Sequence, residues 1–262
     1  LDNGEKGLTM QVLFELTAMF IFYSLFAFSV LVGLLGFINL IFIKKPIVYN
    51  QNNNSSLVSV LIPARNEEIN IKRCLYSLID QSYKNLEIIV LDDDSSDQTF
   101  EIVKEISGKY DSVRLIKGEN KTKGWTGKNW ACFQLSKHAK GDFLLFVDAD
   151  TKLQKNTIAE SVSEMNNNDI DLITLFPNRI TKTAIDKVIS VTIGWFIFSC
   201  LPIIFSNKNP MFSSAFGQFL LFRKSAYFSV GGHESIKDKI LDDFELGRCK
   251  ILHLLPDSPA GR

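Results

Sequence analysis

The segment from Leu86 to Asp97 reads LEIIVLDDDSSD, and it decides the fold: a short apolar run stops abruptly at a cluster of acidic residues. A later segment, from Asp142 to Asp150, follows the same plan and reads DFLLFVDAD. Short apolar runs bounded by turn-forming residues are typical of buried strands. Both segments therefore predict a buried strand with carboxylates just beyond its carboxyl end.

These two segments belong to a regular alternation of apolar runs and stretches of helical periodicity. We predict strands at Leu57–Ile62, Leu86–Leu91, Val113–Ile116, Asp142–Val147 and Asp171–Phe176. Helices are predicted at Glu67–Gln81, Asp97–Lys109, Lys128–Lys137 and Asn156–Asn166. This alternation indicates an α/β fold with a mostly parallel sheet covered by helices. Ligands of such sheets bind beyond the carboxyl ends of the strands, so the residues that follow each strand are the functional candidates.

The composition excludes several classes of protein. Lysines plus arginines equal aspartates plus glutamates at 29 each, and this balance argues against a nucleic-acid-binding protein, which would carry a basic surplus. The four cysteines are far apart and the chain has only three histidines, so neither a zinc site nor a disulfide framework is indicated.

A long apolar run, Leu16–Ile43, marks an N-terminal segment that we place at residues 1–45. The run exceeds the about 20 residues that a helix needs to cross a bilayer. A signal peptide would have a shorter apolar stretch, and a buried core helix is the other alternative. Lys44 and Lys45 follow the run at once, so the positive-inside rule predicts a single-pass protein of the cell (plasma) membrane with everything after Lys45 in the cytoplasm. Residues 46–56, rich in asparagine and serine, are interpreted as a polar linker.

The acidic residues at the two strand ends suggest a metal site. Carboxylates crowded at one sheet edge repel one another unless a positive group lies between them, and a divalent cation would supply it. Mg²⁺ and Mn²⁺ prefer oxygen ligands and often take one or two carboxylates together with substrate phosphates. The alternative is that Ser96, Asp97 or Asp150 simply caps the helix that follows.

Two other loops carry candidate binding residues. The first predicted strand leads into Pro63-Ala64-Arg65-Asn66-Glu67, where Asn66 could cap a helix and Glu67 would suit its dipole. Gly124-Trp125-Thr126-Gly127-Lys128-Asn129 offers glycines for close backbone approach, a lysine charge and a helix N-terminus, which together suit a diphosphate. An ordinary loop with a solvated lysine is the alternative for this second segment.

Taken in order, the motifs of this chain resemble those of the inverting family 2 glycosyltransferases. The motifs are PARNE at 63–67, DDDSSD at 92–97, DAD at 148–150 and LDDFELGR at 241–248. GWTGKN at 124–129, FGQF at 216–219 and GGHE at 231–234 are similar to the membrane-bound branch that glycosylates carotenoid-type or hopanoid-type lipids. The resemblance implies a GT-A-type nucleotide-diphospho-sugar transferase fold, with helices on both faces of a mostly parallel sheet plus the N-terminal transmembrane helix. It places the catalytic domain at residues 57–248.

The resemblance also implies roles for individual residues. Asp93 corresponds to the aspartate that contacts the uracil of the nucleotide, and Asp94 stands where glycine is common. Asp148 and Asp150 correspond to the Asp-x-Asp pair, with Asp150 expected to hold Mn²⁺ or Mg²⁺ against the donor diphosphate. The resemblance further implies a general base at Asp243, with Asp242 where glutamate is usual. The expected donor contacts come from Pro63, Arg65, Glu67 and Lys128. The expected acceptor side is formed by Gly217, Gln218 and His233.

A second apolar stretch, Val188–Phe205, raises the question of another membrane segment. A single crossing would put Asp150 and Asp243 on opposite sides of the membrane, so we expect a helix at the bilayer surface or a lining for an apolar acceptor. A buried core helix is the alternative. A lipid acceptor and a nucleotide-sugar donor are the expected partners.

Two other functions stay open from the sequence. A polysaccharide-building transferase is one, although the chain has no Gln-x-x-Arg-Trp motif. The second is an inactive fragment that only binds nucleotide or membrane, because residues 249–262 show no clear amphipathic pattern and are atypical of the family.

Overall fold

The apolar runs of the sequence form the strands of one sheet in the computed structural model, which describes residues 2–42, 56–176, 181, 183–200, 216–239, 246 and 251–254. These residues include seven strands in the order β3-β2-β1-β4-β6-β5-β7. Their bounds are β1 Val58–Ala64, β2 Leu86–Asp92, β3 Val113–Lys117, β4 Phe143–Val147, β5 Leu172–Leu175, β6 Phe219–Arg223 and β7 Ile251–Leu254. Only β6 runs antiparallel to its neighbours β4 and β5, so the prediction of a mostly parallel sheet is confirmed.

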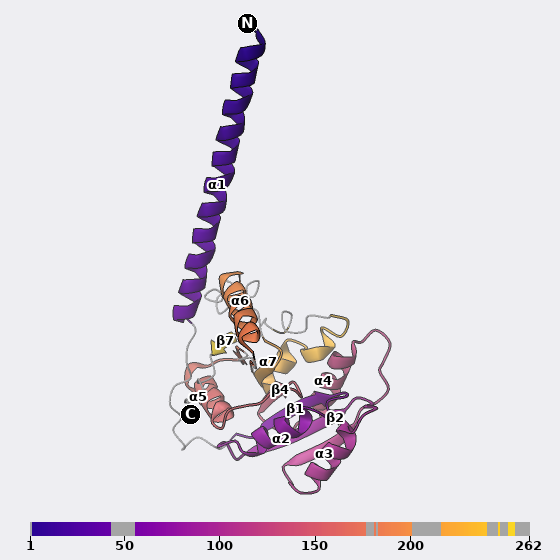
Figure 1. The fold of residues 1–262 in the computed structure, drawn as a ribbon. Helices are drawn as coiled ribbons and strands as arrows, with labels where there is room; N and C mark the ends of the chain where they lie inside the picture. The colour runs from indigo at the N-terminus through magenta and orange to yellow at the C-terminus, as the bar shows by residue number, and fades with distance from the viewer. Residues whose placement is uncertain are drawn as a thin grey trace. The chain divides into compact units, whose positions relative to one another are not determined.

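Helices cover both faces of this sheet (Figure 1). They are α2 Ile71–Ile79, α3 Thr99–Ser107, α4 Gly127–His138, α5 Thr157–Asn168 and α7 Lys224–Ser229. Because successive side chains of a strand point to opposite faces, β1 buries Val60 and Ile62 beneath α2, α3 and α5, and Leu61 beneath α4 and α7. The expected sheet with helices on both faces is therefore confirmed.

A second compact unit consists of α1, Asp2–Phe42, and α6, Ala184–Cys200. Within α1, the segment Met10–Ile41 is long and apolar enough to cross a membrane. In its most apolar stretch of 18 residues, only 6% is buried. A core helix of a soluble domain would be mostly buried, so this alternative does not fit α1. The helix α6 packs against α1 and also keeps most of its large apolar side chains exposed, so it is not a buried core helix either.

Some boundaries and elements differ from the predictions. The helix predicted from Glu67 begins instead at Ile71. The residues before it form a separate turn, in which the Glu67 oxygen accepts from the N–H groups of Asn70 and Ile71. The N–H groups of Glu67 and Glu68 bond to Thr99 Oγ1 and Asp97 Oδ2, at the start of α3 and just before it. Neither β6 nor α7 was predicted. Residues 249–262, judged atypical, contain β7, which pairs in parallel with β5. Of the predicted linker, only Ser56 lies within the described residues.

Candidate active site

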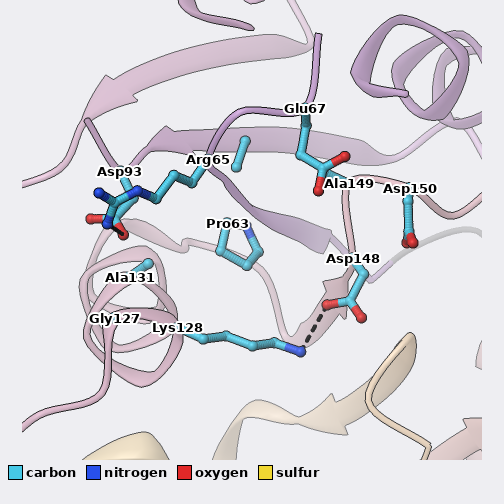
Figure 2. A pocket seen from close by; sticks show the side chains of 11 residues that line it. Pro63, Arg65, Glu67, Asp93, Gly127, Lys128, Ala131, Asp148, Ala149 and Asp150 are labelled. Atoms are coloured by element: carbon cyan, nitrogen blue, oxygen red, sulfur yellow. Dashed lines mark ion pairs between the residues drawn. The ribbon is translucent and has the colours of Figure 1, made fainter. Parts of the chain in front are cut away.

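A cleft of about 360 Å³ lies at the carboxyl ends of β1, β2 and β4 (Figure 2). The residues that line it are Pro63, Ala64, Arg65, Glu67, Asp93, Gly127, Lys128, Ala131, Asp148, Ala149 and Asp150. The structure thus brings together all of the predicted donor-side and metal residues, from three strand ends and the first turns of α4. Because β1, β2 and β4 are parallel, their carboxyl ends lie at the same edge of the sheet. Residues that are more than eighty positions apart in the sequence can therefore meet in this cleft.

Two ion pairs lie at the two ends of this cleft (Figure 2). The Arg65 guanidinium is 3.7 Å from an Asp93 carboxylate oxygen, and Lys128 Nζ is 2.9 Å from Asp148 Oδ1. Partial burial raises the pKa of Asp93, and the neighbouring Arg65 opposes this rise. The cleft therefore presents positive and negative groups side by side, which is what a nucleotide with its anionic diphosphate requires.

The loops after β1 and β2 hold each other in place. Asn66 Oδ1 accepts hydrogen bonds from the N–H and the hydroxyl of Ser96, and the Asn66 N–H donates to Ser95 Oγ. Asn66 and Asp94 both adopt the left-handed backbone region, with φ of 55° and 57°. The prediction that Asn66 caps a helix is therefore wrong, since α2 begins later and its N-cap residue is Asn70. The left-handed φ also explains why glycine is the residue expected at position 94.

The capping alternatives for the acidic residues have separate outcomes. Asp97 Oδ1 accepts a hydrogen bond from the N–H of Thr99, the first residue of α3, so Asp97 does serve the start of that helix. Asp150 lies well before α5, which begins at Thr157, and its side chain lines the cleft. Capping therefore accounts for Asp97 and does not account for Asp150.

One face of α2 supports the loop that contains Asp148 and Asp150, and sequence reasoning missed it. Arg73 donates to the Asp150 backbone oxygen at 3.1 Å, Ser77 Oγ accepts from the Leu153 N–H, and Gln81 bonds to the backbone of Gln154 and Ile158. Arg73 and Ser77 lie four residues apart on α2, and Gln81 follows at the same spacing just after the helix ends at Ile79, so polar residues at helical spacing were the available signal.

Beneath the same loop lies Cys74. Its thiol is 3.9 Å from the Asp148 backbone oxygen, and burial, followed by the charge of Asp150, raises the pKa of Cys74 to about 12. The thiol is therefore neutral and inert at physiological pH.

The start of α4 holds the chain that leads toward the predicted base. Thr126 caps α4 by accepting from the Asn129 N–H, and the Thr126 N–H donates to the Lys237 oxygen. The buried Asn129 side chain donates to the oxygens of Ile236 and Lys239, at 2.8 and 3.0 Å. Asp242 and Asp243 lie outside the described residues.

The predicted acceptor-side residues have different surroundings. A small second cavity is lined by Gly217 and His233 together with Pro63, Lys128 and Asp148 of the main cleft. His233 is buried, its Nδ1 is 2.8 Å from the Tyr227 hydroxyl, and burial, followed by the charge of Lys128, lowers its pKa to about 3. Gln218 is exposed and lines neither cavity.

The described residues include no group of three or more His, Cys, Asp and Glu side chains that could hold a metal by themselves. The Asp148 and Asp150 side chains nevertheless line the same cleft as Lys128. A hard divalent ion that keeps one or two carboxylates and takes its remaining oxygens from a diphosphate fits this donor set.

Solved structures of transferases share this fold. The mannosyltransferase PcManGT from Pyrobaculum calidifontis, in complex with GDP-Man and Mn2+, superposes with a TM-score of 0.66 at 17% identity, over 88% of this chain and 64% of its own. The 1–349 portion of Staphylococcus aureus TarS, in complex with UDP, gives a TM-score of 0.54 at 22% identity, over 76% of this chain and 57% of its own. The fold is therefore of the GT-A type.

The family follows from the sequence match. Residues 59–228 match the family described as Glycosyl transferase family 2, and the chain belongs to this family. It is 31% identical over 212 residues to the 4,4'-diaponeurosporenoate glycosyltransferase of Staphylococcus haemolyticus, covering 77% of this chain and 54% of that protein. The Staphylococcus aureus protein of the same name is 31% identical over 214 residues, with coverage of 78% and 54%. The chain thus spans about half the length of the curated relatives that it matches.

Proposed function

We propose that this chain carries the donor-binding part of an inverting glycosyltransferase that moves a sugar from a nucleotide-diphosphate sugar to a hydroxyl or carboxyl of a carotenoid-type lipid. The observation that carries the proposal is the convergence of Asp93, Lys128, Asp148 and Asp150 in one cleft at the carboxyl edge of the sheet. The names of the relatives support the acceptor class.

The proposed donor is a UDP-sugar. Asp93, at the end of the cleft near Arg65, would accept hydrogen bonds from the nucleotide base, and its partial burial strengthens such bonds. Lys128, at the other end, would contact the diphosphate beside the N-terminus of α4. The UDP complex of a structural neighbour supports this choice of nucleotide.

Asp150, with Asp148, is the proposed holder of Mn²⁺ or Mg²⁺, and the Mn2+ complex of a structural neighbour supports a divalent ion. When bound, such an ion neutralises charge that develops on the departing diphosphate. Lys128 now pairs with Asp148 at 2.9 Å, so a diphosphate that binds here offers Lys128 a second anionic partner.

The proposed reaction is a single displacement. A carboxylate of Asp243 takes the proton of the acceptor hydroxyl while the acceptor oxygen bonds to the anomeric carbon, and the bond from that carbon to the diphosphate oxygen breaks. One displacement inverts the anomeric centre. The support for Asp243 is a set of hydrogen bonds that ties the nearby segment 236–239 to the start of α4, beside the cleft. In this tether the Asn129 side chain donates to the oxygens of Ile236 and Lys239, and the Thr126 N–H donates to the Lys237 oxygen.

We further propose that α1 anchors the protein in the cell membrane and that the catalytic domain is cytoplasmic. The length and apolar composition of Met10–Ile41 and the two lysines that follow support this topology.

The test uses membranes that contain the full chain, a panel of labelled UDP-sugars, Mn²⁺ and, as separate acceptors, a carotenoid alcohol and a carotenoid acid. We expect label in the lipid fraction for the wild type, loss of transfer to the alcohol with retained UDP binding for Asp243→Asn, and weaker metal-dependent UDP binding for Asp150→Asn. The acid is already deprotonated at neutral pH, so transfer to it should depend less on Asp243. Transfer into a polymer would favour a polysaccharide-building enzyme. UDP binding without any transfer or donor hydrolysis would refute the enzyme and favour a binding fragment.

A further inference from the structure

The helix α6 exposes an unusual amount of apolar surface. Its large apolar residues with exposed side chains are Ile185, Val188, Ile189, Val191, Ile193, Trp195 and Phe196. At about 100° per residue they spread over on the order of 200° of the helix circumference. Val191 is 71% and Phe196 is 62% exposed. A surface of this extent on one helix requires an apolar cover.

The partner of α6 indicates what that cover is. Within their common unit, α6 packs against α1, the helix that is long and apolar enough to cross a membrane. A Cβ on Gly36 would lie 2.8 Å from Ser199 Oγ and 3.6 Å from Ser199 Cα, so two small residues meet where the helices are in close contact. Small residues at a close helix contact are characteristic of helix pairs in membranes. Because the two helices share an interface, the medium that surrounds this part of α1 also surrounds α6.

The connections of α6 to the sheet exclude a single crossing of the membrane by the segment between β5 and β6. The chain leaves the sheet after β5 and returns at β6, and these strands are antiparallel neighbours with Thr174 opposite Leu220. Phe176 and Phe216 place their rings 5.1 Å apart, and Thr174 Oγ1 bonds to both the N–H and the oxygen of Phe216. Departure and return therefore lie at one point of the sheet edge, so the segment ends on the side of the membrane from which it started.

The length of α6 agrees with this conclusion. Its 17 residues span roughly 25 Å at about 1.5 Å per residue, short of the about 30 Å of a bilayer's hydrocarbon core. Its contact on α1 lies at Gly36, close to the end of the candidate span at Ile41 and to Lys44 and Lys45.

We propose that α6 is a re-entrant arm, embedded in the lipid leaflet that adjoins the catalytic domain and packed there on α1. The proposal rests on the membrane anchoring by α1 stated above. Its consequence concerns the acceptor: the arm joins the sheet where Phe219 pairs with Val147, directly before Asp148. The chain itself therefore connects the lipid phase to the sheet edge that carries the cleft, which suits an acceptor drawn from the bilayer.

The first test measures whether lipid touches α6. The chain has three tryptophans, so Trp125→Phe with Trp130→Phe leaves Trp195 as the only one. The full-length double variant is reconstituted in phosphatidylcholine vesicles with and without brominated acyl chains. We expect brominated lipid to quench Trp195 strongly, and to quench the matched Trp195→Phe protein, which keeps the two tryptophans of the catalytic domain, much less. Unquenched Trp195 would overturn the proposal, whether water, protein or a second copy covers α6.

The second test measures the helix pair. The Gly36 Cβ position is 3.7 Å from Ser199 Cβ, within the range for a disulfide, whereas a Cβ at Gly33 meets no atom within 4 Å. In a Cys200→Ser background, Gly36→Cys with Ser199→Cys should form a disulfide in oxidised membranes, detected by peptide mass spectrometry. Gly33→Cys with Ser199→Cys is the control that should not. Equal cross-linking of both pairs, or of neither, would overturn the contact.

These outcomes separate the arm from the proposed function. Extraction of the protein by alkaline carbonate would refute membrane anchoring itself. A membrane-retained protein with quenched Trp195 and no transfer would refute the enzyme and leave the arm standing. Retention with unquenched Trp195 would refute the arm alone.

Discussion

The hydrogen bonds of Asn129 allow a direct test of whether the start of α4 positions the predicted base. The Asn129 amide donates to the backbone oxygens of Ile236 and Lys239, and the side chain is 1% exposed. Asn129→Ala removes both bonds, each with a net worth of about 1 kcal/mol, so the tether loses about 2 kcal/mol. If that energy holds the segment preceding Asp242 and Asp243 in its active position, the transfer rate should fall about 30-fold, since about 1.4 kcal/mol corresponds to a factor of ten.

The assay compares the transfer rate at saturating donor with the dissociation constant for UDP. We expect the rate to fall and the UDP affinity to change less than about twofold, because Asn129 does not line the cleft. The control is Gln134→Ala on the same helix, which removes a comparable pair of bonds, to the Glu119 N–H and the Trp130 oxygen, away from the tether. An unchanged rate for Asn129→Ala, or an equal loss for Gln134→Ala, would refute the reasoning.

Three further predictions concern folding stability, each measured by urea denaturation. Asp94→Ala should be less stable than Asp94→Gly by about 1 kcal/mol, because position 94 has a φ of 57°; equal stability would contradict the left-handed backbone. Gly232→Ala should cost on the order of 2 kcal/mol, since its Cβ would lie 2.5 Å from Tyr227 Cζ; Gly124→Ala, with positive φ but no atom within 4 Å, should cost less. His233 has a pKa of about 3 in the folded protein, below the 6.5 of an unperturbed histidine, so the unfolded state binds more protons between these pH values. The free energy of unfolding therefore carries no penalty from His233 above pH 6.5 and falls by about 1.4 kcal/mol per pH unit as the pH drops from 6.5 toward 3. The variant His233→Gln should lack this dependence on pH.

The part of the fold that the sequence predicts well is the part that depends on local pattern. The strands β1 to β5 are short apolar runs with acidic or turn-forming residues at their ends, so they lie within a residue or two of the predicted bounds. Because parallel strands bring their carboxyl ends to one edge, the same pattern also predicts that Asp93, Asp148 and Asp150 share a cleft.

The parts that the sequence did not predict depend on contacts between distant segments. The strand β6 was not predicted because it does not continue the regular alternation of strand and helix patterns along the chain. The strand β7 is only four residues long, which is too short to give a clear pattern. The pairing of both strands is set by their neighbours in space, β4 and β5. The support of the Asp148 loop by Arg73 and Ser77 likewise depends on contacts between distant segments, because polar residues at helical spacing do not indicate which loop they bind. Asn66 was predicted to cap a helix, but it adopts the left-handed backbone conformation instead. Its N–H and its side-chain oxygen bond to Ser95 and Ser96, some thirty residues further along the chain, and no local pattern indicates these partners.

The charges of the cleft refine the argument for a metal. Crowded carboxylates alone suggested a cation, yet the chain itself supplies two: Arg65 pairs with Asp93 and Lys128 with Asp148. Among the ion pairs between described residues none involves Asp150, and Arg73 binds the backbone oxygen of Asp150 and leaves its carboxylate aside. Among the described residues, the cleft carboxylates without an ion pair are therefore those of Glu67, which accepts from the Asn70 amide, and Asp150. A metal-bound diphosphate would give Asp150 a positive partner while also offering Lys128 a new anion. The case for a divalent ion consequently depends on Asp150 more than on the number of acidic residues at the strand ends.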